Sequence, residues 1–395
     1  MAKIQNFKGG VTMRDSVAEW FGLKRPNFIL DPKEDAQFYA PRTGVDIPKL
    51  VEGLQVNLVT DRAPKRFFWG IYGGGKTHTL FHITVQLQKL LPIYPVYVEC
   101  PSVPRKSTFL HLYHDGIMVS MGQDFVLELF DDLISSIGTV RFEELLTRLK
   151  EILNDEELSR AVASLLGART EKRLTFWRYI SGVSVPSRDL AELNQTESLA
   201  DAIPSRLANI VIIIGKVVKR VKNKTLVLII DELDRLKSVT DEYGISTYEE
   251  AFRRLVDENQ RDVAVIMGCS AKNLRELPDI FGGERGPILS RIGPHNLIEI
   301  SEILENDVDI FIKTILNYVV DKKQAQQRIE QLIKEGVDET LEIDLFPFTK
   351  EAIEALKGTL RGIMTPREIT QRMSDAAGKA FLMKKPVITR EVIGG

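Results

Sequence analysis

The chain has 395 residues, with 53 Lys or Arg against 55 Asp or Glu and a formal net charge of −2. This length exceeds what one hydrophobic core usually supports, so we expect two or three packed units. The balanced charge excludes an overall positive field that would draw the chain onto nucleic acid, and any contact with DNA must therefore be local.

Neither the cysteines nor the apolar runs indicate a secreted or membrane protein. Cys100 and Cys269 lie in apolar surroundings without metal-ligand spacing, which favours two core thiols in a reducing compartment. The apolar run Ile210 to Ile214 is far shorter than the roughly 20 residues that span a bilayer, and Met1 to Phe7 lacks a signal-peptide apolar region. The sequence predicts a cytoplasmic protein without a membrane partner.

In chain order, the first elements predicted are a polar arm and a βαβ unit. Residues 1–50 are polar and interrupted by prolines, so we expect a flanking arm that forms no core, with one short helix at Arg14–Phe21. A strand, a glycine-rich loop, a helix and a second strand are then predicted at Arg66–Gly70, Gly70–Thr77, Lys76–Leu91 and Val96–Cys100. This order is typical of the opening of a parallel sheet.

A long helical stretch separates this opening from the rest of the sheet. Residues 101–221 show mostly helical periodicity and no further clear strand, with helices expected at Phe142–Leu153 and Glu156–Leu166. They predict a large helical insertion. Three more strands are expected at Thr225–Ile230, Val263–Met267 and Asn296–Ile300, and a helix near Tyr248–Leu255. The nucleotide-binding core would thus cover residues 51–300.

The last part of the chain is predicted to be helical. After Ser301 we expect helices interrupted by a loop around Leu341–Phe348, and Thr349 is a suitable N-cap for a helix at Lys350–Leu360. Residues 301–395 are therefore predicted to form a separate all-α lid.

The glycine-rich loop carries the first functional motif. Residues 70–77, Gly-Ile-Tyr-Gly-Gly-Gly-Lys-Thr, match G-x-x-x-x-G-K-[ST] between a strand and a helix. Backbone N–H groups and the helix N-terminus would bind the phosphates of ATP. Lys76 would neutralise the γ-phosphate, and Thr77 would bind Mg²⁺. The glycines that permit this turn are Gly70, Gly73, Gly74 and Gly75.

Two histidines follow the loop. His78 directly succeeds the motif and is counted among the nucleotide-binding residues. His78 and His82 are four residues apart and could resemble a metal pair, but no carboxylate at suitable spacing accompanies them. The sequence therefore disfavours a histidine metal site.

The second motif is a buried-type strand that ends in two carboxylates, Asp231 and Glu232. Ligands of open α/β sheets bind at the carboxyl ends of strands. Asp231 would orient Mg²⁺, and Glu232 would act as general base on the attacking water. A kinase of small molecules would not need the second acid. Asp234 and Arg235 are expected to form a solvated or interface pair.

Together, the two motifs resemble those of AAA+ ATPases, and within them the branch of origin-recognition and transposition-regulator ATPases. The resemblance covers about residues 60 to 390 and is strong only at the motifs. It implies an α/β fold, with a three-layer P-loop NTPase core around a parallel sheet and a C-terminal all-α lid. It also implies ring or filament homo-oligomers that hydrolyse Mg·ATP at subunit interfaces.

The resemblance also suggests roles for polar residues at two other strand ends. Where the family keeps a sensor for the γ-phosphate, this chain has Ser270, with Asn273 as second candidate, and the usual asparagine is displaced or replaced. Glu99 occupies the position of a polar switch residue that contacts the catalytic glutamate. It departs from the family because a neutral amide is more usual there.

Two arginines complete the set implied by the resemblance. Arg291 lies where related ATPases carry the arginine that reaches a neighbour's γ-phosphate, with Arg285 in reserve, and a surface ion pair is the alternative. Arg367, in Thr-Pro-Arg-Glu-Ile, would touch the nucleotide of its own subunit, and Pro366 suits a helix start. An exposed first-turn arginine is the alternative.

The work driven by ATP stays open between three hypotheses. The first is a DNA-associated regulator or loader that recruits an unidentified partner enzyme, of mobile-element or phage-defence type. The second is a protein-remodelling or signalling switch without nucleic acid, and the third, a metabolic enzyme, is disfavoured by the carboxylate pair. An origin initiator is disfavoured because little length follows the lid. A basic run that could face phosphates comprises Lys216, Lys219, Arg220, Lys222 and Lys224.

Overall fold

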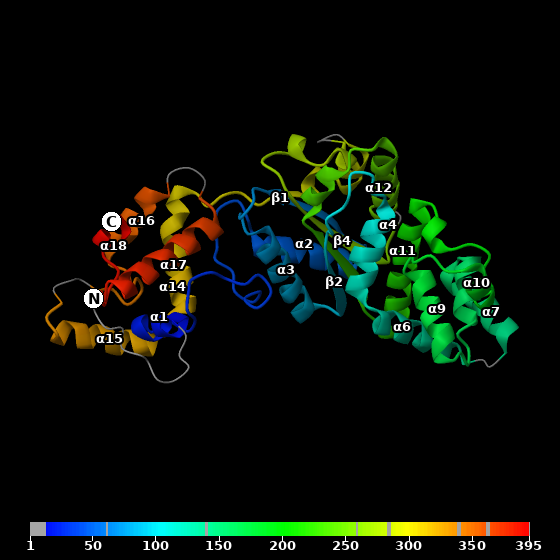
Figure 1. Cartoon of the computed structure of the whole chain (residues 1–395), viewed down its shortest axis with the longest axis horizontal. Coiled ribbons are helices and arrows are strands. Elements are labelled where there is room, and N and C mark those ends of the chain that lie inside the picture. The colour runs from blue at the N-terminus through cyan, green and yellow to red at the C-terminus, as the bar shows by residue number, and fades with distance from the viewer. Residues whose placement is uncertain are drawn as a thin grey trace, which may run out of the picture. The chain divides into compact units, whose positions relative to one another are not determined.

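The computed structural model describes residues 13–60, 62–138, 141–257, 260–282, 286–337, 341–360 and 364–394. The chain divides into two compact units. The unit that we call the sheet unit comprises residues 47–70 and 83–299. The other, the helical unit, comprises residues 1–46, 71–82 and 300–395. Figure 1 colours both by position in the chain.

Five parallel strands form one sheet, as the sequence predicted. Their order in the sheet is β2-β3-β4-β1-β5. The strands are β1 (Lys65–Gly70), β2 (Ile93–Glu99), β3 (Thr225–Asp231), β4 (Val263–Ser270) and β5 (Leu297–Glu299). Successive residues of β3 and β4 are buried, so both faces of the sheet are covered, as is usual for parallel sheets. Gly70 pairs with Ser270 and Glu99 with Asp231. The carboxyl ends of β1 to β4 therefore share one edge.

Helices account for the rest of the sheet unit. The longer ones are α2 (Ile47–Val59), α3 (Lys76–Leu90, which begins in the helical unit), α6 (Gln123–Ile137), α7 (Phe142–Leu153), α8 (Glu156–Ala163), α9 (Thr170–Ile180), α11 (Pro204–Lys222) and α12 (Glu242–Leu255). The short ones are α4 (Phe109–His111), α5 (Val119–Met121), α10 (Ser187–Glu192) and α13 (Pro287–Ile292). The described residues between 101 and 221 contain no strand, and Figure 1 shows α6, α7, α9 and α10 grouped at one end of this unit. None of the described helices is long and apolar enough to cross a membrane.

The helical unit has its own hydrophobic core. Its helices are α1 (Met13–Phe21), α14 (Val308–Val319), α15 (Lys322–Lys334), α16 (Lys350–Thr359), α17 (Pro366–Leu382) and α18 (Arg390–Gly394). The predicted caps are confirmed. The Thr349 hydroxyl accepts from the Ala352 amide, and Pro366 is the first residue of α17. The C-terminal stretch is therefore helical, as predicted.

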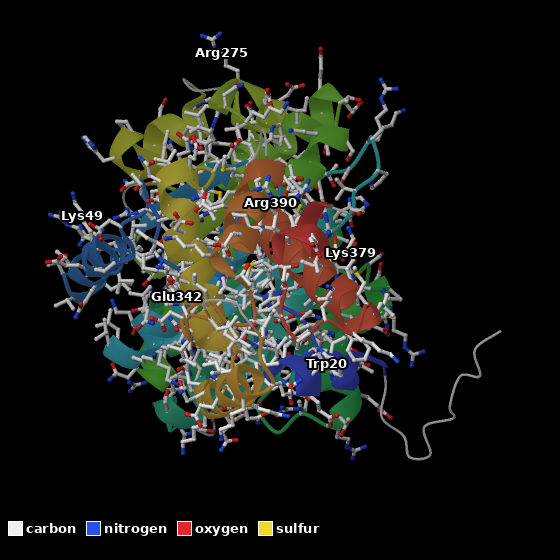
Figure 2. The ribbon with its side chains drawn as sticks, turned by 90° about the vertical axis from the view of Figure 1, so that its left-hand side faces the viewer. Trp20, Lys49, Arg275, Glu342, Lys379 and Arg390 are labelled. Carbon is white, nitrogen blue, oxygen red and sulfur yellow. The ribbon has the colours of Figure 1, made fainter. Side chains whose placement is uncertain are left out.

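The N-terminal segment differs from the expected arm. Phe21 and Phe28 are fully buried in the core of the helical unit, and Phe28 packs against Phe348. Trp20, labelled in Figure 2, packs edge-on against Phe381, and its indole N–H donates to the Lys385 carbonyl at 2.9 Å. The segment has too few apolar residues for a core of its own. It buries them in a core made mainly by distant helices, which local sequence patterns do not reveal.

Candidate functional site

The glycine-rich loop directly follows β1, as its motif predicts. Gly73 and Gly75 have φ values of 75° and 86°, in the left-handed region that favours glycine. A Cβ atom at Gly73 would come within 3.3 Å of the Thr365 hydroxyl. The side chain of Lys76 is buried, and its ammonium donates to the Ile71 carbonyl at 2.7 Å. The backbone of the loop thus binds the ammonium group of Lys76.

Arg42 contacts this loop, and the sequence analysis did not predict it as a site residue. It is 9% exposed and donates to the Gly74 carbonyl at 2.6 Å and to the Ser301 carbonyl at 3.4 Å. Its Nε has no hydrogen-bond partner, and no ion pair of Arg42 is found within the described ranges. A cation buried without a carboxylate is costly unless something anionic compensates it. Because Arg42 comes from a proline-rich loop 32 residues before Gly74, no motif marks it.

The histidines after the loop contact the backbone of the N-terminal segment. The ring of His78 lies 3.1 Å from the Asp35 carbonyl, and that of His82 lies 2.8 Å from the Ala36 carbonyl. Burial lowers the pKa of His78. Among the described residues there is no group of three or more metal-ligand side chains. These contacts anchor the start of α3, and a nucleotide contact by His78 stays a prediction.

Arg367 lies against the glycine-rich loop. Its guanidinium donates to the hydroxyl of Tyr72 at 2.6 Å and sits 5.2 Å from the centre of that ring. Both residues line a pocket of about 450 Å³ beside the N-terminus of α17. Arg367 is exposed in the first turn of α17, as the alternative from the sequence has it, although it lies against the phosphate loop. Contact with a nucleotide stays a prediction.

The acidic motif ends β3 as predicted. Asp231 is 1% exposed, and its two oxygens accept from the Glu232 amide at 2.8 Å and from the Tyr97 hydroxyl at 3.0 Å. Burial, followed by the charge of Asp231, raises the pKa of Tyr97, so the phenol stays protonated and donates. Carboxylate oxygens are the protein ligands that Mg²⁺ and its bound waters prefer. The donor set fits a hydrated Mg²⁺ ion.

Glu232 adopts φ 57°, which costs a non-glycine residue about 1–3 kcal/mol and is often found at functional sites. Its carboxylate pairs with Arg235. Arg235 also donates to Glu99 at 2.6 Å and to the Cys100 carbonyl at 2.7 Å. Burial raises the pKa of Glu232, while the charge of Arg235 opposes this rise. Arg235 thus connects the predicted base with the predicted switch residue.

The sequence predicted that Asp234 and Arg235 form a pair with each other, and this prediction is wrong. Asp234 instead accepts from the backbone amide of Ser270 at 2.9 Å, which ties the turn after β3 to the end of β4. Ser270 thereby lies at the same sheet edge as Asp231. Asn273 caps a short turn through the Arg275 amide and Glu276. The geometry favours Ser270 over Asn273 as the candidate sensor, whose role stays a prediction.

Arg291 lies on α13, near the opposite edge of the sheet. It lines a pocket with Lys65, the first residue of β1, whereas the carboxyl end of that strand is roughly 16 Å away along a strand that rises about 3.3 Å per residue. Its guanidinium donates to the Pro287 carbonyl, and no ion pair of Arg291 is found in the described part of the chain. The reserve candidate, Arg285, lies outside the described residues.

The basic run of α11 is partly neutralised. Lys222 donates to Glu128 and to Asp132, each at 2.7 Å, and these contacts raise its pKa. Lys216 and Arg220 line a pocket with both Arg148 and Glu151, so their charge is only partly offset there. The run is therefore a weaker candidate for contact with nucleic acid than its sequence suggests.

No protein-family model and no curated protein matches the chain. Among solved structures, the Aeropyrum pernix ORC1 protein in complex with DNA is 11% identical, covering 93% of this chain and 69% of that chain at a TM-score of 0.44. Drosophila ORC bound to DNA is 12% identical, covering 100% and 68% at 0.44. The Aeropyrum pernix ORC2 protein is 10% identical, covering 91% and 70% at 0.45. They are origin-recognition proteins, as the motif resemblance leads one to expect, but at such low scores no function or residue role is carried over from them.

Proposed function

We propose that the chain is an ATPase that binds Mg·ATP with the loop Gly70–Thr77 and hydrolyses it with Glu232 as general base. Lys76 neutralises the γ-phosphate, and Thr77 and Asp231 bind the hydrated Mg²⁺ ion. Glu232 takes a proton from the attacking water.

One observation carries this proposal. In the strand order, β4 alone separates β1 from β3, and the two strands end at the same sheet edge in Gly70 and the buried Asp231. The phosphate loop and the acidic pair thus follow two strands that end at the same edge of the sheet with one strand between them, and ligands of parallel α/β sheets bind at such an edge. The positive φ values of Gly73 and Gly75 and the buried Lys76 support phosphate binding by the loop.

Two variants test this function. Lys76→Ala should weaken ATP binding in a titration by roughly 100-fold or more, since it removes the main charge opposite the triphosphate. Lys89→Ala, at the exposed end of the same helix, is the matched control and should bind normally. Glu232→Gln should bind Mg·ATP and release phosphate far more slowly. Unchanged binding in Lys76→Ala, or turnover of Glu232→Gln within a few-fold of wild type, would overturn the assignment.

The work of the ATPase is proposed to be that of a DNA-associated regulator or loader which assembles as a ring or filament and recruits a partner enzyme, of mobile-element or phage-defence type. The resemblance of the two motifs supports this, and a protein-remodelling switch without nucleic acid is the alternative. DNA binding with and without ATP, measured over a range of salt, discriminates between them. Contacts to DNA phosphates give a steep salt dependence, and a switch acting on protein alone binds no DNA.

A further inference from the structure

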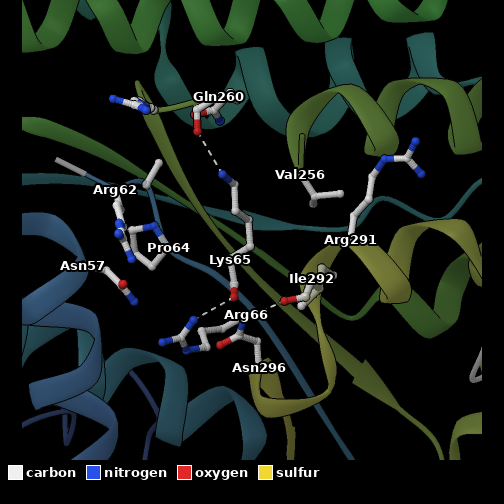
Figure 3. A pocket seen from close by; sticks show the side chains of 12 residues that line it. Asn57, Arg62, Pro64, Lys65, Arg66, Val256, Gln260, Arg291, Ile292 and Asn296 are labelled. Atoms are coloured by element: carbon white, nitrogen blue, oxygen red, sulfur yellow. Dashed lines mark hydrogen bonds between the residues drawn. The ribbon is translucent and has the colours of Figure 1, made fainter. Parts of the chain in front are cut away.

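A second concentration of positive charge lies in the sheet unit, away from the edge just described. It surrounds a pocket of about 260 Å³ between α2, the start of β1, the residues before β4 and α13 (Figure 3). Its described lining residues include five cationic side chains and no acidic one. The cationic residues are Arg62, Lys65, Arg66, Arg261 and Arg291.

The arginines of this pocket are not neutralised within the described part of the protein. Lys65 donates to the Gln260 carbonyl at 2.9 Å, and Arg66 donates to the Lys65 carbonyl at 3.0 Å, as the dashed lines of Figure 3 show. No described carboxylate forms an ion pair with Arg62, Arg66, Arg261 or Arg291.

The charge of this pocket is partly sheltered from water. Lys65 and Arg66 are half-buried beside the buried Val256 and Ile292, whereas Arg62, Arg261 and Arg291 are exposed at its rim. Arg66 is half-buried, and burial lowers its pKa. The clustering of these cations beside a hollow favours an anion-binding role.

We propose that this pocket binds a compact polyphosphate anion, such as the triphosphate of a nucleotide. Guanidinium groups match phosphate oxygens with paired hydrogen bonds, which favours phosphate over other anions. Arg62, Lys65, Arg66 and Arg261 line one hollow, whereas Arg291 also borders a second pocket with Glu249, Glu250 and Asp257. A small cluster of this kind favours a compact polyanion over a nucleic-acid backbone. Because the pocket lies at the amino ends of the strands, the ligand is separate from the nucleotide at the carboxyl ends.

The polyphosphate can be free in solution or held by a second copy of the chain. The second source rests on the proposed function, because the phosphate would then belong to ATP bound by the other copy. Arg62, Arg66 and Arg261 would bind this ATP together with Arg291. The first source is independent of ATP hydrolysis.

The test uses the full chain with Lys76→Ala, which disables the phosphate loop, titrated with inorganic tripolyphosphate by calorimetry. One site is expected, and adding Arg62→Ala and Arg261→Ala should weaken it at least about tenfold. Adding Arg188→Ala and Arg275→Ala instead removes the same charge at exposed positions elsewhere, Arg275 projecting outward in Figure 2, and should change affinity less than about twofold. Wild type should show two tripolyphosphate sites, which keeps the test valid if Lys76→Ala folds poorly.

Absence of a second tripolyphosphate site in wild type that binds ATP, or equal weakening by both pairs of substitutions, would overturn the proposal. So would displacement of tripolyphosphate by an oligonucleotide more readily than by ATP, which would assign the pocket to nucleic acid. To distinguish the sources, wild type loaded with a non-hydrolysable ATP analogue is sedimented with and without tripolyphosphate. Dissociation of assemblies indicates a phosphate supplied by a second copy, and unchanged assembly indicates a free ligand. If wild type fails to bind ATP at all but Lys76→Ala binds tripolyphosphate, the proposed function fails and this pocket stands.

Discussion

Arg235 and Glu232 form an ion pair three residues apart, directly after β3. The same guanidinium donates to Glu99 at the end of β2. Two carboxylates that would otherwise repel each other thus share one cation, which replaces the direct hydrogen bond that a neutral amide at position 99 could make. The ionisation of the predicted base therefore depends on both neighbours.

This arrangement predicts opposite shifts of the acidic limb of the pH–rate profile. Arg235 lowers the pKa of Glu232 and Glu99 raises it. Since a general base must be ionised to act, Arg235→Ala should move the limb to higher pH and Glu99→Gln to lower pH. The limbs are measured as ATPase kcat against pH. The ion pair of Arg253 with Glu249 on α12 supplies control variants that should leave the limb in place. Shifts of the same sign in Arg235→Ala and Glu99→Gln would disprove the shared-cation account.

Arg42 should contribute more to the stability of the nucleotide-bound protein than to that of the protein without nucleotide. Its guanidinium is buried beside Gly74 and Gly75 without an ion pair in the described residues, so phosphates bound by the loop would compensate its charge. In Arg42→Met, the rise in melting temperature caused by ATP should shrink markedly, whereas the protein without nucleotide should lose little stability. Differential scanning calorimetry with and without ATP measures both. An equal loss of stability in both states would make Arg42 a purely structural residue.

Arg291 is expected to act on ATP held by a neighbouring subunit. It lies near the amino ends of its own strands, and an added arginine in a phosphoryl-transfer site is worth roughly a thousandfold or more in rate. Arg291→Ala and Lys76→Ala should each be nearly inactive alone. Mixed, they should regain part of the ATPase activity, because some interfaces pair an intact loop with an intact arginine. Mixed oligomers without any recovered activity would contradict action in trans.

Assembly should accordingly depend on nucleotide. A γ-phosphate bound across an interface links subunit contact to the state of the nucleotide. Sedimentation should show larger species with a non-hydrolysable ATP analogue than with ADP. Identical profiles with the analogue, with ADP and without nucleotide would count against ATP at the interface.

The N-terminal segment should contribute to stability. Phe21 is fully buried in the core of the helical unit, and Phe→Ala in a core costs about 3–5 kcal/mol. Phe21→Ala should therefore lower the denaturation midpoint clearly, while Leu382→Ala, at a residue 68% exposed, should not. A midpoint of Phe21→Ala equal to that of wild type would instead support the expected flanking arm that forms no core.

Local patterns in the sequence determined the elements and the two motifs. The strand before Gly70, the glycines that require positive φ, and the apolar run before Asp231 each depend on neighbouring residues, and so does the cap at Thr349. Both the first and the last residue of α7 were predicted correctly, because its apolar residues recur at helical spacing. β4 runs three residues past its predicted end, because pairing of Ser270 with Gly70 extends it.

Contacts between distant residues were decided only by the tertiary structure. The link of Arg42 to Gly74, the replacement of the expected Asp234–Arg235 pair, and the gathering of Arg62, Arg261 and Arg291 join residues separated by tens to hundreds of positions. No periodicity or spacing encodes such contacts, because they depend on strand order and on how loops of different lengths return to the sheet. The sequence thus specified which chemical groups are present, and the packing of the chain determined which of them meet.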